Sequence, residues 1–357
     1  MIRMTLRQFR TEAIVGIGLL TTLAIVVAVT GVHLLDVNNA FRSACKAARE
    51  CASVPNPVIN VDTPLQGALP LIVIITPALI GLFFGAPLVA RELEMGTFRL
   101  VWTQSITRRR WFAVKLAVIG IISMMTGGLV TWMVDWWASP LDALRQNRFG
   151  LAQFGFHEIA PIGYTAFAFA LGVASGVLLR RTVAAMVLTG VGFAATRLAV
   201  TYWVRPNLIS PAHKSIPFSS GSDLDFSVST KGSISLNISN VRVPNGWVYS
   251  TTALNKAGRV PTSRYLLHTC PAVFKPGTIL NRSRGGMQSI GKSPGTPAGS
   301  PWFQACFNKL DTALHMVVTY QPASRFWLLQ WAETGIFLAA AIALCGLTYC
   351  WLRRQYS

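Results

Sequence analysis

The chain has 357 residues, of which 52% are hydrophobic and only 13% are charged. Soluble domains average about 25% charged residues, so this composition excludes disorder and argues against an ordinary soluble domain. The charge is one-sided, with 32 Lys and Arg against 13 Asp and Glu and a formal net charge of +19. A basic balance often indicates a nucleic-acid ligand. Here it accompanies a membrane-like composition. The positions of the basic residues must therefore decide between a nucleic-acid ligand and a membrane protein.

Six charge-poor apolar segments are long enough to cross a bilayer, which takes about 20 helical residues. They are residues 14–35, 68–90, 115–135, 158–180, 182–204 and 326–352. A cleaved signal peptide is the competing interpretation of the first segment, but its apolar part is too long and no small-residue cleavage site stands out. We predict an α-helical polytopic membrane protein with six transmembrane helices.

The basic residues of the short loops predict the orientation, because Lys and Arg are in excess on the cytoplasmic side. They gather at the N-terminus, between the second and third spans, at Arg180-Arg181 and at Arg353-Arg354, which all lie on one side if the spans alternate. Both termini are therefore expected in the cytoplasm, with the chain in the cell membrane. No nucleic acid is expected as a partner, because the basic residues form no single groove-sized patch.

The segment from Arg205 to Arg325 joins the last two spans and is predicted to be an extracellular α+β cap. It is rich in Ser, Gly, Pro and basic residues. Alternating residues predict strands at 234–243 and 246–254, while 311–319 is expected to be helical and 281–300 a flexible loop. The expected organisation is 1–204 for the first five spans, 205–325 for the cap and 326–357 for the last span and tail.

Four of the six cysteines, Cys45, Cys51, Cys270 and Cys306, fall in segments expected outside, where disulfides form. Four cysteines allow three pairings. We favour the local pairs Cys45–Cys51 and Cys270–Cys306, while a cross-pairing and free thiols stay open. No metal site is expected, because the cysteine spacings match no zinc pattern and the histidines are isolated.

The chain is expected to carry no catalytic site. We expect neither an ATP-binding P-loop nor an esterase nucleophile elbow, and the metalloprotease pattern H-E-x-x-H does not occur. The energy for any transport is therefore expected to come from a partner or a gradient.

The most informative segment is the second span with its cytoplasmic continuation. The span contains three prolines and Gly81-x-x-x-Gly85, and a Gly172-x-x-x-Gly176 pair occurs in the fourth span. Prolines kink membrane helices and small residues let helices approach closely. The elbow 91–110 follows the second span, with two acids, a Gly-Thr pair, an apolar stretch and three arginines before the third span.

This elbow resembles that of the membrane subunits of type-2 ABC exporters, which read roughly R-E-x-E-x-G-T and then S/T-x-x-R. The matching residues are Arg91, Glu92, Glu94, Gly96, Thr97, Ser105 and Arg108. The resemblance implies that the elbow is the coupling helix that docks on an ATPase subunit, with Phe98 and Trp102 on its apolar face. A solvated charged loop is the alternative interpretation.

A second resemblance covers Tyr320 to Glu333, which is similar to the start of the last span in an actinobacterial subgroup of these permeases with a large cap. The family resemblance implies a homodimer that pairs with two copies of a separate ATPase, which holds ATP and Mg, while this chain needs no cofactor. It also implies an alternating-access cavity lined mainly by the second and fifth spans.

Two charges interrupt the apolar spans. At 1.5 Å per residue, Arg197 lies roughly 22 Å from the inner end of its span and Glu333 roughly 10 Å from the outer end. Their matched depth and opposite signs predict that they face each other or a shared polar cavity. Snorkelling of each side chain to the interface is the alternative.

The expected function is that of an exporter permease that moves an amphiphilic drug, lipid or peptide out of the cell. The alternatives are a gradient-driven carrier and a membrane-anchored extracellular receptor or sensor. A carrier needs acid or base relays in both leaflets, whereas Arg197 and Glu333 both lie in the outer half. An anchored receptor has no need for six spans and a coupling elbow.

Overall fold

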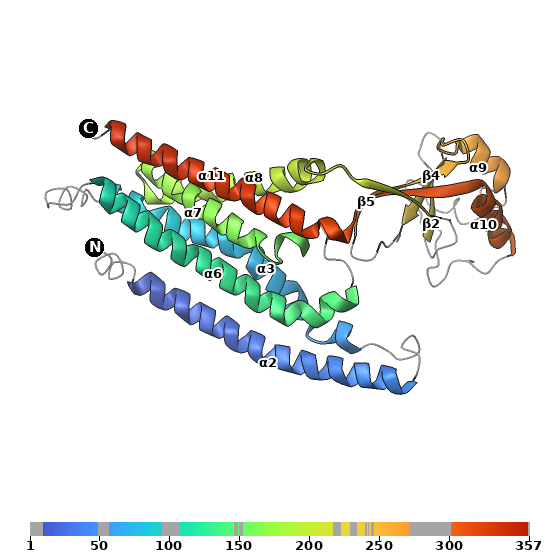
Figure 1. Cartoon of the computed structure of the whole chain (residues 1–357), viewed down its shortest axis with the longest axis horizontal. Helices are drawn as coiled ribbons and strands as arrows, with labels where there is room; N and C mark the ends of the chain where they lie inside the picture. The colour runs from blue at the N-terminus through green and yellow to red at the C-terminus, as the bar shows by residue number, and fades with distance from the viewer. Residues whose placement is uncertain are drawn as a thin grey trace. The chain divides into compact units, whose positions relative to one another are not determined.

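The computed structural model describes residues 10–48, 57–94, 108–145, 149, 153–216, 223–228, 234–239, 241, 243, 246–271 and 301–355. The chain forms two compact units, one of Met1–Ile209 with Phe326–Ser357 and the other of Ser210–Arg325. The first unit is a helical bundle and the second contains the strands (Figure 1).

Among the described residues, six helical segments of the bundle are long and apolar enough to span a membrane, which confirms the predicted fold class. Its helices are α2 (Arg10–Ala48), α3 (Thr63–Ile80), α4 (Pro87–Glu94), α6 (Arg108–Arg145), α7 (Ala160–Leu179), α8 (Thr182–Ala199) and α11 (Phe326–Gln355). Two π-helical turns, η3 (Gly81–Gly85) and η5 (Val200–Val204), and the 3₁₀ turns η2 (Pro57–Asn60), η4 (Gln153–Gly155) and η6 (Arg205–Asn207) complete it.

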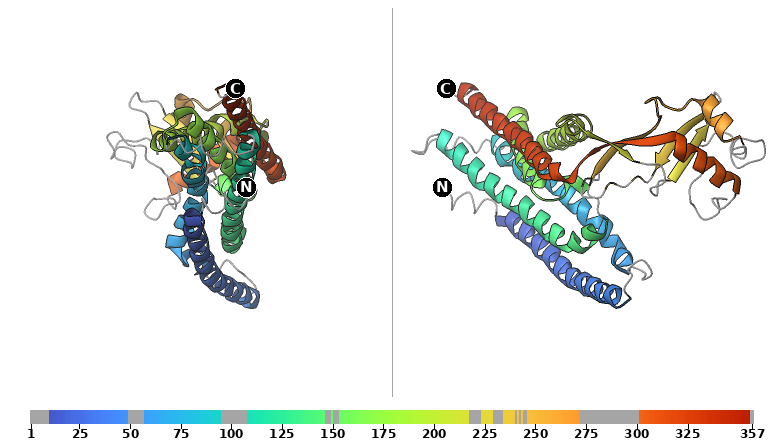
Figure 2. Two further views of the ribbon diagram at one scale, coloured as in Figure 1. Left: turned by 90° about the vertical axis from the view of Figure 1, so that its left-hand side faces the viewer. Right: turned by 45° about the vertical axis from the view of Figure 1, so that its right-hand side comes forward.

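Helix α7 forms the core of the bundle. Fifteen of its twenty residues are buried, and it packs against α11, α8, α6 and α3. Helix α2 lies at one edge, where it packs on α6 and leaves most of its apolar residues exposed (Figure 2). A side chain at almost any position of α7 therefore meets another helix, whereas α2 presents a surface suited to lipid.

Glycines let α7 approach the second span closely. A Cβ on Gly176 would lie 2.5 Å from the Ala86 carbonyl oxygen, and one on Gly172 would collide with the Gly81 carbonyl oxygen and lie 2.7 Å from the Ala86 nitrogen. The carbonyl of Gly81 also accepts the π-turn hydrogen bond from the Ala86 amide at 2.9 Å. Both small-residue pairs, Gly81/Gly85 and Gly172/Gly176, thus serve contacts within one chain.

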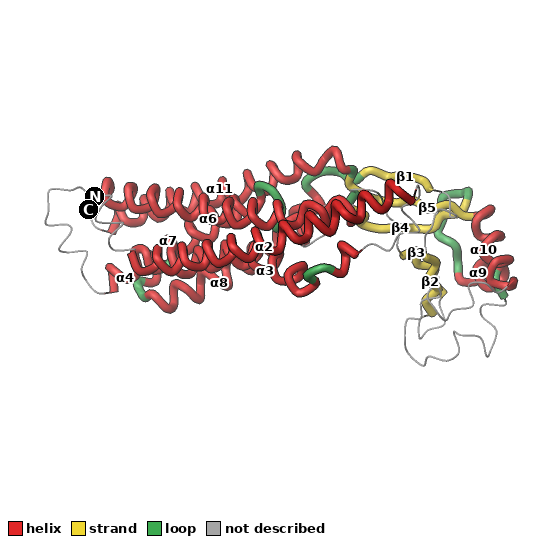
Figure 3. The backbone as a smooth tube through the Cα atoms, turned by 90° about the horizontal axis from the view of Figure 1, so that it is seen from below, coloured by secondary structure: helices red, strands yellow, loops and turns green. Residues whose placement is uncertain are grey.

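In the second unit, the described residues form two antiparallel sheets (Figure 3). The order of the larger sheet is β1-β5-β4, and β2 pairs with β3. The strands are β1 (Ala212–Ile216), β2 (Asp223–Val228), β3 (Ile234–Ser239), β4 (Trp247–Asn255) and β5 (Leu314–Gln321). The unit begins at Ser210 rather than at the expected Arg205, because Arg205 is buried in the helical bundle.

A disulfide joins Cys270 to Cys306 in this unit. It links the end of α9 (Ser263–Thr269) to α10 (Pro301–Ala313), and both cysteines are buried. The other favoured pair includes Cys51, which lies outside the described residues, so the pair with Cys45 stays a prediction. The expected loop 281–300 lies outside them too.

The helix expected over residues 311–319 is wrong. Helix α10 ends at Ala313, and Leu314–Gln321 forms the central strand β5, which pairs with β1 and β4. Leu314, Met316 and Val318 point to the buried side in alternation, and the β-branched run at 317–319 favours a strand. Strand pairing on both sides outweighs the helical start of the segment.

The close packing of α7 yields a matched pair of predictions. Gly172→Ala is expected to destabilise the protein by about 1–3 kcal/mol, because the added methyl group meets rigid backbone on the second span. Gly190→Ala is the control, since its nearest neighbours are side-chain atoms of Leu82 at 3.8 Å. Thermal unfolding of the purified variants in detergent measures the difference. Equal unfolding temperatures would contradict the close approach.

Candidate functional site

The elbow predicted to contact an ATPase is described only at its two ends. Helix α4 carries the chain to Glu94, and α6 begins at Arg108. Arg91 and Glu94 are exposed. Gly96, Thr97, Phe98 and Trp102 lie outside the described residues, as do the side chains of Glu92 and Arg108, so their role stays a prediction.

Glu94 joins the end of the second span to the beginning of the fifth. Its Oε2 accepts hydrogen bonds from the Thr182 amide at 3.0 Å and from the Thr182 hydroxyl at 2.7 Å. Thr182 is the first residue of α8, and Arg181 before it makes no side-chain capping bond. The Glu94 carboxylate thus acts as the helix cap from another segment, where the positive end of the helix dipole favours an anion. The two hydrogen bonds hold the pKa of Glu94 below its usual value.

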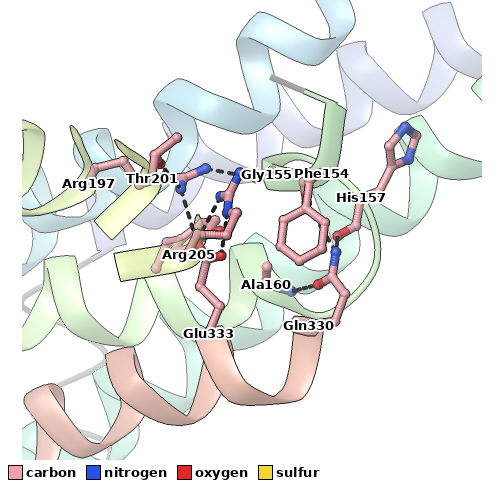
Figure 4. A network of polar contacts seen from close by, with 10 residues as sticks. Phe154, Gly155, His157, Ala160, Arg197, Thr201, Arg205, Gln330 and Glu333 are labelled. Carbon is pink, nitrogen blue, oxygen red and sulfur yellow. Dashed lines mark hydrogen bonds and ion pairs between the residues drawn. The ribbon is translucent and has the colours of Figure 1, made fainter. Parts of the chain in front are cut away.

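The structure brings Arg197 and Glu333 together with Arg205 (Figure 4), and Tyr164 contacts the same carboxylate. Nη1 of Arg197 lies 3.2 Å from Oε1 of Glu333, and the Tyr164 hydroxyl donates to the same oxygen at 2.6 Å. Arg205 forms a bidentate pair with the carboxylate, at 2.8 Å from Nε to Oε2 and 2.9 Å from Nη2 to Oε1. Glu333 and Arg205 are fully buried, so the carboxylate ties α7, α11 and the end of the fifth span together.

Aromatic rings cover both arginines. The guanidinium carbon of Arg197 lies 3.7 Å from the centroid of the Tyr164 ring, and that of Arg205 lies 4.5 Å from the centroid of the Phe154 ring. These distances are typical of cation–π contacts, which strengthen away from water. The rings therefore help to hold two cations in an apolar part of the bundle.

Sequence reasoning missed two members of this cluster, Tyr164 and Arg205. Arg205 is the second arginine of the fifth span that contacts Glu333. It lies eight residues after Arg197, and at about 100° per residue a regular helix would place the two side chains about 80° apart. The π-turn η5 between them holds one extra residue, which reduces the offset to about 20°. The π-turn thus places the two arginines on one face of the helix, where both contact one carboxylate. No residue pattern in the sequence predicts this π-turn.

Gln330 fixes the same end of α11, one turn before Glu333. Its side-chain oxygen accepts from the Ala160 amide at 3.0 Å, and its nitrogen donates to the Phe154 carbonyl at 3.1 Å. The side chain is fully buried. It therefore pairs the first amide of α7, which has no partner within its own helix, and links it to the carbonyl of Phe154 in η4.

His157 forms a further buried contact, just before α7. Its Nδ1 lies 2.5 Å from Oδ1 of Asp135, and its Nε2 lies 3.5 Å from Oδ2 of Asp142. Asp135 also accepts from the amide of Glu158, which has a left-handed φ of 61°. Burial acts to lower the pKa of His157, but the hydrogen bond to Asp135 and the charges of Asp142, Asp135 and Glu158 prevail and raise it.

Two short segments match the spacing of the P-loop and nucleophile-elbow motifs, which were not expected in this chain. Residues 286–293, GMQSIGKS, match the spacing G-x-x-x-x-G-K-S, and 291–295, GKSPG, match G-x-S-x-G. Both motifs function only between a strand and a helix. Here prolines at 294 and 297 and glycines at 295 and 299 oppose a following helix. The segment lies outside the described residues, and the matches carry no argument for catalysis.

In the described part of the chain, no group of three or more His, Cys, Asp or Glu residues is placed to hold a metal ion.

The family comparison covers the first five spans but not α11. The family model described as ABC-2 membrane transporter related matches residues 17–205, more than half of the chain. The chain belongs to this family. The match ends at Arg205, so it includes Arg197 and Glu94 but not Glu333. Comparison with curated proteins and with solved structures finds no match.

Family membership makes the chain a permease-type membrane subunit that pairs with an ABC ATPase. The six apolar helices fit a multi-pass membrane protein. The expected resemblance to type-2 ABC permeases is thereby confirmed at the level of the family.

The ion-pair cluster yields the next prediction. Glu333→Gln is expected to destabilise the protein by about 3–5 kcal/mol, because it leaves Arg205 buried without its counter-charge. Thermal unfolding in detergent measures the loss. Asp36→Asn is the matched control, since Asp36 is an exposed acid on α2. A Glu333→Gln protein as stable as the control would show that the cluster does not hold the bundle.

The His157 contact predicts a pH dependence. Its pKa is raised above 6.5 in the folded state, so its stabilising contribution is complete below pH 6.5 and is lost as the pH rises through the raised pKa. His157→Gln is expected to flatten this part of the stability profile. His33→Gln is the control, because His33 is exposed. Unfolding temperatures measured from pH 5.5 to 9 test this, and a wild-type profile that is flat above pH 6.5 would contradict it.

Proposed function

We propose that the chain is the permease subunit of an ATP-driven exporter for amphiphilic compounds such as drugs, lipids or peptides. Two copies form the translocation pathway, and two copies of a separate ATPase bind the elbow between α4 and α6. Both termini lie in the cytoplasm, and the Ser210–Arg325 unit faces outside. Family membership supports the transporter role, and the basic residues of the short loops support the orientation.

The hydrogen bonds between Glu94 and Thr182 carry the proposal of coupling. Glu94 lies at the end of α4, where the predicted coupling elbow begins, and Thr182 begins the fifth span. A push on the elbow is thus transmitted directly to α8 without passing through a flexible loop. We name this contact the Glu94–Thr182 clasp. It links the two spans that line the pathway in the proposed mechanism.

The apolar surfaces of these two spans support amphiphilic cargo and a second copy. Helix α8 exposes a stripe of Val183, Val187, Val191 and Leu198, and the second span exposes Leu71, Ile75, Leu79 and Phe83. The members of both stripes are four residues apart, with one step of seven between Val191 and Leu198, and so lie on one face of each helix. A face of this kind suits either another apolar helix or the chains of an amphiphile.

The clasp gives a sharp test. Glu94→Ala in proteoliposomes with the partner ATPase is expected to keep ATP hydrolysis but to lower severalfold the cargo moved per ATP, because the elbow no longer holds the beginning of α8. Thr182→Val removes only the hydroxyl contact and is expected to have a smaller effect in the same direction. The measurement compares ATP hydrolysis with the movement of a fluorescent amphiphile. Glu92→Ala tests the neighbouring acid of the elbow.

Asp36→Asn is the control for loss of an exposed acid, and it is expected to leave the amount of cargo moved per ATP unchanged. Normal coupling in both Glu94→Ala and Thr182→Val would remove the clasp from the mechanism. A chain that forms no complex with an ABC ATPase would contradict the proposal as a whole.

A further inference from the structure

The cluster around Glu333 contains two guanidinium groups and one carboxylate. Arg197 and Arg205 both contact this carboxylate, and Tyr164 adds a neutral hydroxyl. The remaining acceptors of Arg197 in the described part of the chain are neutral: the Thr201 hydroxyl at 3.1 Å and the Gly155 carbonyl at 3.4 Å. One acid therefore serves two cations inside an apolar span.

The oxygen of Glu333 that Arg197 contacts, Oε1, already accepts two hydrogen bonds without Arg197. A carboxylate oxygen offers about two lone-pair positions, yet Oε1 of Glu333 receives three donors. The Tyr164 hydroxyl lies at 2.6 Å, Nη2 of Arg205 at 2.9 Å and Nη1 of Arg197 at 3.2 Å. Arg197 makes the longest of the three contacts, and its hydrogen bond to the Gly155 carbonyl is longer still. Its positive charge is therefore the less completely compensated of the two.

Arg197 is also the accessible member of the pair. Its side chain is 17% exposed, against 1% for Arg205. The neighbouring Leu198 and Tyr202 are exposed, and the apolar stripe of α8 continues from them along the span. An incompletely neutralised guanidinium thus borders an apolar surface. An anionic amphiphile fits this arrangement, because its head group is negative and its chain is apolar.

We propose that Arg197 binds the anionic head group, a phosphate or a carboxylate, of an amphiphile whose apolar chain lies on the exposed stripe of α8. Guanidinium groups favour these planar or tetrahedral oxyanions because they donate two parallel hydrogen bonds. The head group supplies the second negative charge, and Glu333 stays paired with Arg205. The amphiphile is either a bilayer lipid or the cargo, and binding does not depend on the exporter function.

The test titrates the purified full-length chain in a neutral detergent with phosphatidylglycerol or with phosphatidylcholine of the same acyl chains. Native mass spectrometry measures the bound lipid. The wild-type protein is expected to prefer phosphatidylglycerol, and Arg197→Gln is expected to weaken its binding by about tenfold, as for loss of a charge-assisted hydrogen bond. Arg197→Lys keeps the charge and is expected to restore part of the preference.

Arg42→Gln is the matched control, because Arg42 is an exposed arginine near the end of α2 and its loss tests general charge attraction. An unchanged preference in Arg197→Gln, or an equal loss in Arg42→Gln, would overturn the proposal. Equal binding of the two lipids by the wild-type protein would overturn it as well.

A second arm separates the two sources of the ligand. Proteoliposomes with the partner ATPase are loaded with fluorescent phosphatidylglycerol, and its ATP-dependent movement between leaflets is measured. Movement that Arg197→Gln abolishes assigns the anionic amphiphile as cargo. Binding without movement assigns a resident lipid, and it leaves the exporter proposal to the separate test of the Glu94–Thr182 clasp.

Discussion

A single buried carboxylate organises the end of the bundle where the fifth span meets α7 and α11. Glu333 accepts a hydrogen bond from Tyr164 of α7 and forms ion pairs with Arg197 and Arg205 of the fifth span. Gln330 bonds the same part of α11 to the beginning of α7. A charge in an apolar region is stable only when it is paired and hydrogen-bonded. The fold therefore depends on three helices reaching the same point together, and none of them can move there without exposing a charge.

At the opposite end of the fifth span, the Glu94–Thr182 clasp joins α4 to the first residue of α8. Between the two ends, Gly172 and Gly176 of α7 pack against the backbone of the second span. The second and fifth spans are thus both held to α7 along their length. A displacement of the elbow in the proposed mechanism shifts α4 and α8 as connected rigid segments, because neither contact passes through a loop.

The sequence predicts the spans well because the apolar runs are long and the charges within them are few. The pairing of Arg197 with Glu333 followed from depth alone, which needs only a count of residues along a helix. The contact of Arg205 with Glu333 could not be predicted in this way. Arg205 shares a helix face with Arg197 only when a π-turn lies between them, and the formation of that turn depends on tertiary contacts. The strand at 314–321 was missed for a related reason, since its pairing partners lie far away in the sequence.

The π-turn has a consequence for how this segment tolerates changes in length. Most helix ends absorb the loss or gain of a residue in the adjacent loop. Between Val200 and Val204, however, one added residue rotates Arg205 by about 100° relative to Arg197, whereas loss of the extra residue converts the π-turn to regular helix and leaves the offset at about 20°. The segment thus accommodates the loss of one residue but not the gain of one, and an insertion placed here in an alignment of relatives would mark chains in which Glu333 has a different partner.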